Sequence, residues 1–478
     1  MAKTRKKRAS PGSPAGLEKC PTGIPGLDQI TNGGLPKGRT TLVCGSSGSG
    51  KTLLGMEFLV KGGVETGEPG VFIAFEESAG ELAGNVASLG IDVQALIDDG
   101  QLVLEHVRID RSEMEETGEY DLEALFIRLG YAIDSIGAKR VVLDTIEVLF
   151  GALTNTGILR AELRRLFQWL KDKGVTSIVT GERGEGQLTR HGLEEYVSDC
   201  VILLDQRVAN QIATRRLRIV KYRGSAHGSN EYPFLLDEQG FTVTPVTGIS
   251  QQYAVSGDFV STGVASLDDI LGGKGCYRGS TLLVSGTAGT GKSSIAAHFA
   301  DAAGRRGERC IYFAFEESPK QIMRNMRSIG IDLQPWRKKG LLALQAMRPS
   351  SYGLEKLLAI IERTVEQFQP RMVVLDPISS LELSGTFEEA RIAVMRLVDF
   401  LKSRQVTTLL NSLTNSGDPL EQSEVGISSL VDTWLLLRNM EQNGERTRLL
   451  YILKSRGMAH SNHVREFILS DHGVELME

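Results

Sequence analysis

The sequence predicts two consecutive α/β domains, each built on a mostly parallel, twisted sheet flanked by helices. A motif of the form GxxxxGK[ST] occurs twice, at residues 45–52 and 286–293. Further motifs recur at a spacing of 232 to 241 residues, which indicates an internal duplication. Short runs rich in Val, Ile and Phe alternate with helical patterns, as they do where parallel strands are joined by helices.

Each GxxxxGK[ST] motif has the flanks that a phosphate-binding loop needs. Apolar runs at 41–44 and 281–285 precede the motifs, and helical patterns at 53–60 and 294–302 follow them. The glycines allow backbone N–H groups to face a phosphate, the lysine reaches the terminal phosphates, and the last hydroxyl can ligate Mg²⁺. The predicted nucleotide contacts are Ser46, Ser47, Gly48, Ser49, Gly50, Lys51, Thr52, Thr287, Ala288, Gly289, Thr290, Gly291, Lys292 and Ser293.

The duplication sets the predicted domain boundaries. The segment Phe75-Glu76-Glu77-Ser78 returns 240 residues later, and Lys51 and Lys292 differ by 241. We expect a first domain at 17–247 and a second at 248–478. The basic, Pro/Gly/Ser-rich residues 1–16 are expected to be a disordered tail, with a nucleic-acid or partner contact as the alternative.

The first half has eight more residues than the second between its acidic pair and its next Val-Leu-Asp run. The extra residues fall at 108–123, where Glu113, Glu115, Glu116 and Glu119 cluster. An acidic loop of this kind is either simply solvated or a docking site for a partner.

Other segments fill in the expected sheets. Apolar runs at 71–75, 140–143, 177–180 and 201–204 predict strands, and 121–136 and 158–171 predict helices. Alternating segments at 215–220 and 448–453 are expected to add antiparallel strands at the sheet edge.

Asp144 and Asp376 each end a buried apolar run, at the carboxyl edge of a predicted strand. A carboxylate there can hold Mg²⁺ close to the phosphate loop, together with Thr52 or Ser293. The alternative is an aspartate that only caps the strand end.

The pairs Glu76-Glu77 and Glu316-Glu317 follow the strand after each phosphate-loop helix. A carboxylate in that place can accept a proton from an attacking water or hydroxyl as the γ-phosphoryl leaves. An isolated pair of surface acids would be uninformative, but its recurrence in both halves favours catalysis.

A K-x-R-G-x-x-H segment follows the last long strand of each half. Cations so far along the chain from the phosphate loop suit a nucleotide bound between subunits, where the neighbour supplies them. The alternative is a basic hairpin in water. The predicted contacts in trans are Lys221, Arg223, His227, Lys454, Arg456 and His460.

Composition excludes several other classes. The net charge of -5 argues against a surface devoted to duplex DNA. The five cysteines have no CxxC spacing and the histidines no HxxxH spacing, so neither a zinc site nor a disulfide framework is expected. No apolar run is long enough to span a bilayer and no signal-peptide core is present, so a cytoplasmic location is expected.

Together these residues resemble the KaiC family, the circadian-clock ATPase and autokinase built from two RecA-like domains. The likeness covers about residues 17–478, and it also includes Thr-Gly-Glu-Arg at 180–183 and the segment 192–199. It implies tandem RecA-like P-loop NTPase domains in a homohexamer with ATP at the subunit interfaces. The first ring would hydrolyse ATP with Glu76 and Glu77. The second would phosphorylate and dephosphorylate itself, using Glu316 and Glu317.

The resemblance also places two phospho-acceptors at Ser428 and Ser429, where the familiar pair is Ser-Thr, with a further hydroxyl at Ser423. In the internal repeat these serines stand opposite Glu195 and Tyr196, so phosphorylation would add a switchable charge where the first copy has a permanent one. On spacing alone, two serines that cap or line a helix are the alternative.

The last predicted strand, 464–469, lies close to Glu478. The family's clock protein extends into a tail that KaiA engages, so control by KaiA is not expected here. The resemblance leaves a KaiB-like partner open, because the acidic loop near Glu113–Glu119 lies where that partner docks in the family.

Two other functions compete with an ATPase and autokinase. A RecA- or RadA-like DNA-dependent ATPase would need basic, glycine-rich loops, but the segments 147–159 and 379–389 are neutral to acidic. A non-catalytic scaffold would use ATP only to hold its rings together.

Overall fold

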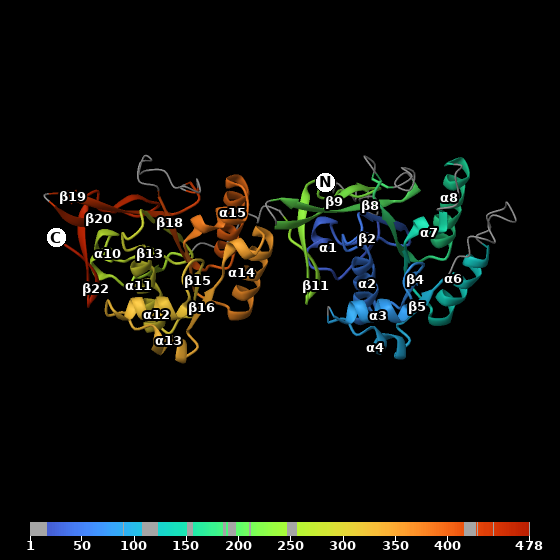
Figure 1. Ribbon diagram of the computed structural model, residues 1–478, viewed down its shortest axis with the longest axis horizontal. Coiled ribbons are helices and arrows are strands. Elements are labelled where there is room, and N and C mark those ends of the chain that lie inside the picture. The colour runs from blue at the N-terminus through green and yellow to red at the C-terminus, as the bar shows by residue number, and fades with distance from the viewer. Residues whose placement is uncertain are drawn as a thin grey trace, which may run out of the picture. The chain divides into compact units, whose positions relative to one another are not determined.

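The computed structural model describes residues 17–88, 90–107, 123–150, 156–184, 188–189, 197–209, 212–245, 256–414, 427, 429–442 and 444–477. The chain divides into two compact units between Val246 and Thr247 (Figure 1). The predicted tail 1–16 and most of the acidic segment lie outside the described residues, as do Glu195, Tyr196, Ser423 and Ser428.

The first unit repeats a strand–helix pattern along most of its length. Its strands are β1 (Lys19–Cys20), β2 (Leu35–Pro36), β3 (Thr40–Gly45), β4 (Gly70–Ala74), β5 (Leu102–His106), β6 (Arg140–Asp144), β7 (Thr176–Glu182), β8 (Cys200–Ala209), β9 (Ile212–Tyr222), β10 (Glu231–Asp237) and β11 (Gly240–Val243). Its helices are α1 (Leu27–Ile30), α2 (Lys51–Lys61) with the π-helical turn η1 (Gly62–Thr66), α3 (Ala79–Ala87), α4 (Val93–Asp98), α6 (Glu123–Ile136), α7 (Ile146–Phe150) and α8 (Thr156–Asp172).

The main sheet of this unit has the order β11-β10-β9-β8-β3-β7-β6-β4-β5. The six strands β8, β3, β7, β6, β4 and β5, which are adjacent in this order, run parallel to one another. The strands β9, β10 and β11 extend the sheet in an antiparallel manner. Because β3 runs parallel to both of its neighbours, β8 and β7, the loop that follows it opens at the carboxyl edge of the sheet, where open α/β sheets bind ligands.

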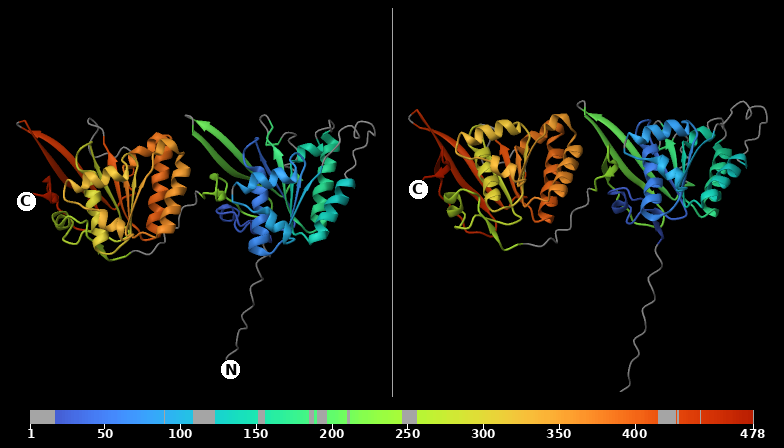
Figure 2. Two further views of the ribbon diagram at one scale, coloured as in Figure 1. Left: turned by 60° about the horizontal axis from the view of Figure 1, so that its bottom comes forward. Right: turned by 90° about the horizontal axis from the view of Figure 1, so that it is seen from below.

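Helices cover both faces of this sheet (Figure 2). Alternate residues of the parallel strands point to opposite faces, so Phe72 packs with Phe58 of α2 on one side, whereas Val71 packs with Leu129 of α6 and Leu166 of α8 on the other. All five side chains are fully buried. A strand that is buried on both faces reads as a continuous apolar run, which is the pattern of these strands.

The second unit has the same design. Its strands are β12 (Phe259–Val260), β13 (Cys276–Tyr277), β14 (Thr281–Gly286), β15 (Cys310–Ala314), β16 (Leu342–Ala346), β17 (Met372–Asp376), β18 (Thr407–Leu413), β19 (Thr433–Gln442), β20 (Glu445–Ser455), β21 (Arg465–Ser470) and β22 (Gly473–Leu476). Its helices are α10 (Ala265–Ile270), α11 (Lys292–Arg305), α12 (Pro319–Arg327), α13 (Gln334–Lys338), α14 (Leu354–Phe368) and α15 (Phe387–Ser403), with 3₁₀ turns η2 (Pro349–Ser351) and η3 (Ile378–Ser384).

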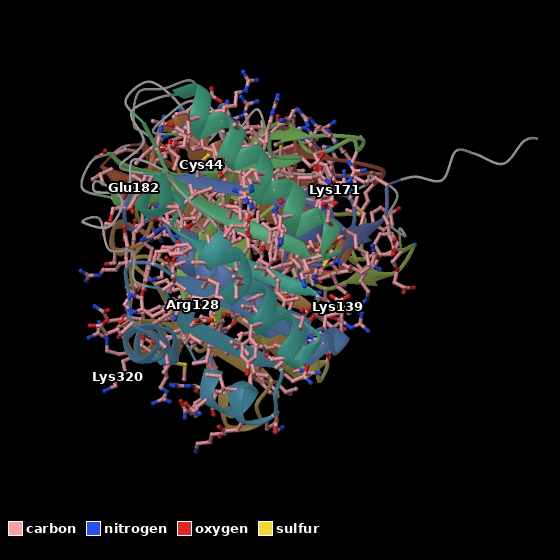
Figure 3. All side chains as sticks on the ribbon, turned by 90° about the vertical axis from the view of Figure 1, so that its right-hand side faces the viewer. Cys44, Arg128, Lys139, Lys171, Glu182 and Lys320 are labelled. Atoms are coloured by element: carbon pink, nitrogen blue, oxygen red, sulfur yellow. The ribbon has the colours of Figure 1, made fainter. Side chains whose placement is uncertain are left out.

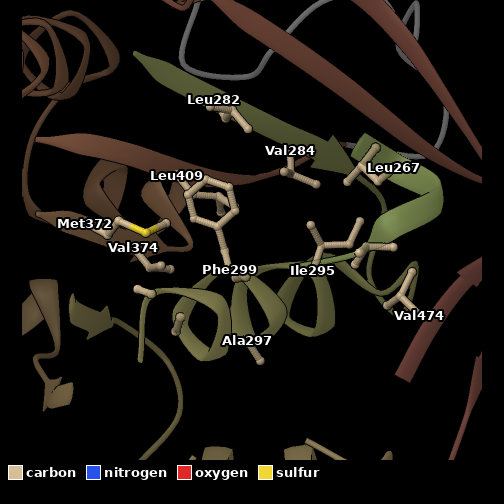
Figure 4. Packing of buried hydrophobic residues seen from close by; sticks show 14 of the residues in the cluster. Leu267, Leu282, Val284, Ile295, Ala297, Phe299, Met372, Val374, Leu409 and Val474 are labelled. Carbon is tan, nitrogen blue, oxygen red and sulfur yellow. The ribbon is translucent and has the colours of Figure 1, made fainter. Parts of the chain in front are cut away.

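Its sheet order, β16-β15-β17-β18-β14-β19-β20-β21-β22, matches that of the first unit strand for strand. Figure 4 shows how α11 is held against it: Phe299 and Ile295 point toward Leu282 and Val284 of β14 and Leu409 of β18. This packing fixes the helix that begins at the second phosphate loop.

The predicted fold class is confirmed. The apolar runs at 71–75, 140–143, 177–180 and 201–204 are β4, β6, β7 and β8, and the two predicted helices are α6 and α8. No helix among the described residues combines the length and the apolarity needed to cross a membrane.

The expected edge position of segments 215–220 and 448–453 is wrong. They lie in β9 and β20, which are antiparallel as predicted, but two further strands pair outside each of them. The strand predicted at 464–469 is β21, and β22 follows it. The outer position of these late strands depends on pairing between distant segments, which apolar periodicity does not specify.

Candidate functional site

The first phosphate loop joins the carboxyl end of β3 to the start of α2. The backbone is left-handed at Gly48 (φ 74°) and Gly50 (φ 99°), which glycine adopts without strain. The ammonium of Lys51 donates to the carbonyls of Gly45 (2.9 Å) and Ser46 (3.0 Å), so the loop curls around it. This places the lysine at the centre of the loop, where it can meet terminal phosphates.

The next hydroxyl and the predicted strand-end carboxylate meet. Thr52 Oγ1 donates to Asp144 Oδ2 at 2.7 Å, and Thr180 Oγ1 donates to Asp144 Oδ1. Two hydroxyls therefore fix both oxygens of a buried carboxylate beside the loop. Hydroxyl and carboxylate oxygens are the ligands that Mg²⁺ prefers, so this donor set fits the ion.

The second loop repeats the first. Gly289 and Gly291 are left-handed (φ 76° and 99°), and Lys292 Nζ donates to the carbonyls of Gly286 (2.7 Å) and Thr287 (2.8 Å). The loop borders a cavity of about 350 Å³. That cavity is lined by Ala288, Gly289, Gly291, Lys292, Ser293, Ser294, Ala314, Glu316, Glu317, Ile322, Asp376, Pro377, Leu413 and Leu469.

The two sites differ around the strand-end aspartate. In the second unit the Tyr312 hydroxyl donates to Asp376 Oδ2, whereas Phe72 occupies the matching position in the first. Asn411 stands where Thr180 stands in the first unit, fully buried, and its side-chain amide has no hydrogen-bond partner among the described residues. The shared motif is thus set in two different polar environments.

The acidic pairs lie at the same edge as the loops. In the first unit Glu76 Oε1 is 3.5 Å from Thr145 Oγ1, and Glu77 accepts from Asn85 Nδ2 at 3.2 Å. The adjacent strand β6 ends at Asp144, and the Phe75 N–H donates to its carbonyl at 2.9 Å. The Glu76-Glu77 pair therefore begins next to Asp144, whose carboxylate accepts the hydrogen bond from Thr52.

In the second unit both acids line the cavity. Ser380 Oγ donates to Glu316 Oε1 at 2.7 Å. Desolvation raises the pKa of Glu317, as do the charges of Asp376 and Glu316, while Arg324 lowers it. A carboxylate whose pKa is raised toward neutrality accepts a proton more readily.

The predicted trans cations do not reach the loop of their own unit. The Arg223 N–H donates to the Asp199 carbonyl (2.9 Å), and the Asp199 N–H donates to the Thr40 carbonyl (3.1 Å) at the start of β3. The phosphate loop leaves from the other end of β3, five residues or about 17 Å away. Lys221 Nζ, at the same end as Arg223, donates to the Ser198 carbonyl at 2.7 Å.

A basic recess surrounds Arg223. It has a volume of about 540 Å³ and includes the cations Arg39, Arg164, Arg165 and Lys171. Of these, Arg39 pairs with Asp199 at 3.3 Å. Figure 3 labels Lys171 on this unit. His227 lies apart, with Nδ1 3.0 Å from the Gly228 carbonyl.

The second unit has the same separation. The Arg456 N–H donates to the Asp432 carbonyl and the Asp432 N–H to the Thr281 carbonyl, at the start of β14. Desolvation and the charge of Arg456 lower the pKa of Lys454. Neither cation lines the cavity beside the second loop. His460 Nδ1 is 3.2 Å from the Ser461 carbonyl.

Comparison with known proteins decides the family. The family described as "ATPase: KaiC" matches residues 20–248 and 260–478. The chain belongs to the KaiC family. It is 60% identical over 464 residues to circadian clock protein KaiC2 of Synechocystis sp. (strain ATCC 27184 / PCC 6803 / Kazusa), covering 97% of this chain and 82% of that protein.

More distant KaiC proteins also align over almost the whole chain. The circadian clock oscillator protein KaiC of Parathermosynechococcus lividus is 38% identical, covering 97% of this chain and 86% of that protein. Circadian clock protein KaiC3 of the same Synechocystis strain is 36% identical, covering 96% and 92%. The two units are therefore tandem KaiC domains of the RecA-like class, and they are ATPase domains.

One of the two serines that the KaiC resemblance predicts as acceptors is described. Ser429 is exposed, and its carbonyl accepts a hydrogen bond from the Arg456 guanidinium at 2.8 Å. It lies beside Arg456, at the amino end of the strands and away from the phosphate loop of its own unit.

Sequence reasoning missed the side chains that back the KaiC phosphate loops. A Cβ at Gly50 would lie 2.8 Å from Leu236 Cδ1, and one at Gly291 would lie 3.3 Å from the Phe467 ring. It also missed Tyr312. When the two halves are aligned, Tyr312 stands at the position of Phe72. The internal repeat therefore shows in the sequence that this position differs between the two sites.

Proposed function

We propose that this protein is a homohexamer that binds Mg²⁺-ATP between subunits, hydrolyses ATP in the first domain, and phosphorylates and dephosphorylates its own Ser428 and Ser429 in the second. It would signal through its phosphorylation state and through partner binding. The observation that carries the proposal is the Arg456–Ser429 hydrogen bond. It supports the proposal because it joins Ser429, the proposed acceptor, to Arg456, a proposed trans cation, at the opposite end of the strands from the ATP loop of the same domain.

In this proposal, that end of the strands serves the loop of a neighbouring subunit. Arg456 and Lys454 would approach the neighbour's γ-phosphoryl group, and the acceptor segment would arrive with them. Lys221, Arg223 and His227 would play the same part in the first ring, where no acceptor serine is present and water is the nucleophile. A cation supplied in trans contributes about 10³–10⁵ in rate.

Mg²⁺ would be held through Thr52 and Asp144 in the first domain and through Ser293 and Asp376 in the second. When bound, it neutralises charge on the β- and γ-phosphates. The hydrogen bond between Thr52 and Asp144 supports this role, because it brings the two oxygen donors together at 2.7 Å.

In the first domain, Glu76 or Glu77 would accept the proton of a water whose oxygen forms a bond to the γ-phosphorus. The bond from that phosphorus to the β,γ-bridging oxygen breaks, so the products are ADP, inorganic phosphate and a proton. In the second domain the serine hydroxyl replaces the water. Glu317 would accept the serine proton, with Glu316 held by Ser380, and ADP leaves as phosphoserine forms.

Purified protein with γ-labelled ATP and Mg²⁺ tests this division. We expect labelled protein, and no label in Ser428→Ala/Ser429→Ala. Glu317→Gln should abolish labelling while phosphate release by the first domain continues. The matched variant Glu77→Gln should do the reverse, slowing phosphate release by about tenfold or more while labelling continues.

Equal loss of both activities in either variant would contradict the division of labour. Assembly with ATP but without phosphate release or labelling would identify a scaffold. Stimulation of the ATPase by DNA would favour a recombinase-like motor.

A further inference from the structure

A strongly basic surface covers α12 and α13 of the second domain. It consists of Lys320, Arg324, Arg327, Arg337, Lys338 and Lys339, and is called the α12–α13 surface below. All six side chains are exposed, and Figure 3 labels Lys320 among them. We propose that the α12–α13 surface docks an acidic polypeptide segment of a partner protein.

The first domain provides an internal control, because residues 79–100 align with 319–340 without a gap. Ser78 and Ser318 both cap the following helix with a capping box. The buried residues also correspond: Ile322 matches Leu82, Met326 matches Val86, and Leu333 matches Val93. The two segments therefore fold alike.

Their charges are opposite. Residues 319–340 contain six cations and one acid, whereas residues 79–100 contain four acids and no cation. Lys338 and Lys339 replace Asp98 and Asp99, and Arg324 replaces Gly84. Since the first domain builds the same helices without any of these cations, folding does not require them.

The six cations form few ion pairs within the described part of the second domain. Among the described residues, the one ion pair of these cations joins Arg327 and Asp332, at 3.5 Å with both side chains more than half exposed. Such a pair contributes little to stability. Arg324 contacts the Asn325 amide oxygen (3.1 Å), and Lys339 lies over the Trp336 ring.

The geometry favours a peptide over a nucleic acid. Lys320, Arg324 and Arg327 lie at i, i+4 and i+7, so they form one stripe along α12 about 10 Å long. Binding of single strands usually needs aromatic rings on which bases stack. The Trp336 ring packs against Gly304, and its N–H donates to Asp301 at 2.6 Å, so it is not available for stacking.

Exposed acids also border the surface. Glu316 and Glu317 precede α12, and Asp332 lies between the two helices. They would repel any anion that extends past the basic side chains, so they limit the bound acidic segment to the α12–α13 surface itself. Ile322 of α12 lines the second ATP cavity, so a docked segment would lie next to that site.

Fluorescence anisotropy of the full-length protein with a labelled peptide of ten glutamates tests the proposal. We expect saturable binding at 50 mM salt that weakens several-fold by 200 mM, as charge pairing at a surface does. Lys338→Asp/Lys339→Asp, which copies the first domain, should weaken binding about tenfold or more.

A matched control is Arg128→Asp/Lys139→Asp, which makes the same charge change on exposed cations of the first domain and should bind like the wild type. Equal losses in both double variants would mean that net charge alone is responsible and would overturn the proposal. So would absence of binding at 50 mM salt, or tighter binding of a labelled ten-nucleotide single strand than of the peptide. A circular dichroism spectrum checks that each variant is folded.

Discussion

At the residue scale, one matched position carries opposite chemistry in the two domains. Glu57 of α2 is 3% exposed and accepts a hydrogen bond from the Phe241 N–H of β11. In the second domain His298 of α11 takes its place, and His298 Nε2 accepts from the Val474 N–H of β22 at 2.9 Å. In both domains a titratable side chain ties the phosphate-loop helix to the last strand.

The two contacts should respond to pH in opposite directions. Desolvation raises the pKa of Glu57 to about 7, although the bond from Phe241 lowers it in part. The folded first domain therefore retains a proton that the unfolded chain has released, and its stability falls as pH rises from about 4.5 to 7. Desolvation lowers the pKa of His298, so the second domain loses stability as pH falls below about 6.5.

Hydrogen exchange of the full-length protein measures both effects. Between pH 5 and 8, β10–β11 should lose about 2 kcal/mol of protection after correction for intrinsic exchange rates. Glu57→Gln keeps the acceptor and should remove that loss. The β21–β22 segment should gain protection over the same range. Parallel behaviour of the two segments would refute the assignment.

Residue roles differ in how far the sequence reveals them. Lys51, Thr52 and Asp144 could be predicted because a motif and a strand end fix their positions. The Glu57–Phe241 contact could not, because its partners are 184 residues apart and no motif contains either of them. Only the tertiary fold brings them together.

At the element scale, the last hairpin of each domain requires a close approach between strands and helix. Gly240 has a φ of 90°, and a Cβ there would lie 2.1 Å from Glu57 Oε1. Gly67 also has a positive φ, 64°, but a Cβ there would meet nothing within 4 Å. Substitutions at these two glycines therefore separate the cost of a left-handed backbone from the cost of a steric clash with Glu57.

We expect Gly67→Ala to cost about 1–2 kcal/mol of unfolding free energy, the penalty for a left-handed alanine. Gly240→Ala should cost about 1–3 kcal/mol more, because the methyl group overpacks a buried site. Thermal unfolding of the first domain, monitored by amide hydrogen exchange in its central strands, measures the difference between the two variants. Equal costs would show that the hairpin can move away from α2.

The elements themselves were predicted unevenly. The apolar runs at 41–44, 71–75, 140–143, 177–180, 201–204 and 281–285 predict β3, β4, β6, β7, β8 and β14 within one residue of their starts, because these parallel strands are buried on both faces. Strand β5 was not predicted, because its residues beyond Leu102 are only partly buried and the run is mixed. The places of β10, β11 and β22 depend on pairing across the domain, which periodicity does not specify.

At the scale of the whole molecule, the proposal requires that ATP sites be completed by neighbouring subunits. Sedimentation or mass photometry in saturating Mg²⁺-ATP should therefore show hexamers. Lys51→Ala should prevent their assembly more than Lys292→Ala if the first domain holds the ring together. A protein that stays monomeric in Mg²⁺-ATP would refute the shared sites and the trans roles of Arg223 and Arg456.

The closing strands also set the order of events during synthesis. Leu236 backs Gly50, and Phe241 bonds to Glu57, so the first phosphate loop has its support only when the ribosome has released the chain to about residue 243. Every strand of that sheet has then been made, and none comes from the second half. The first domain can therefore mature on the ribosome before translation of the second is complete.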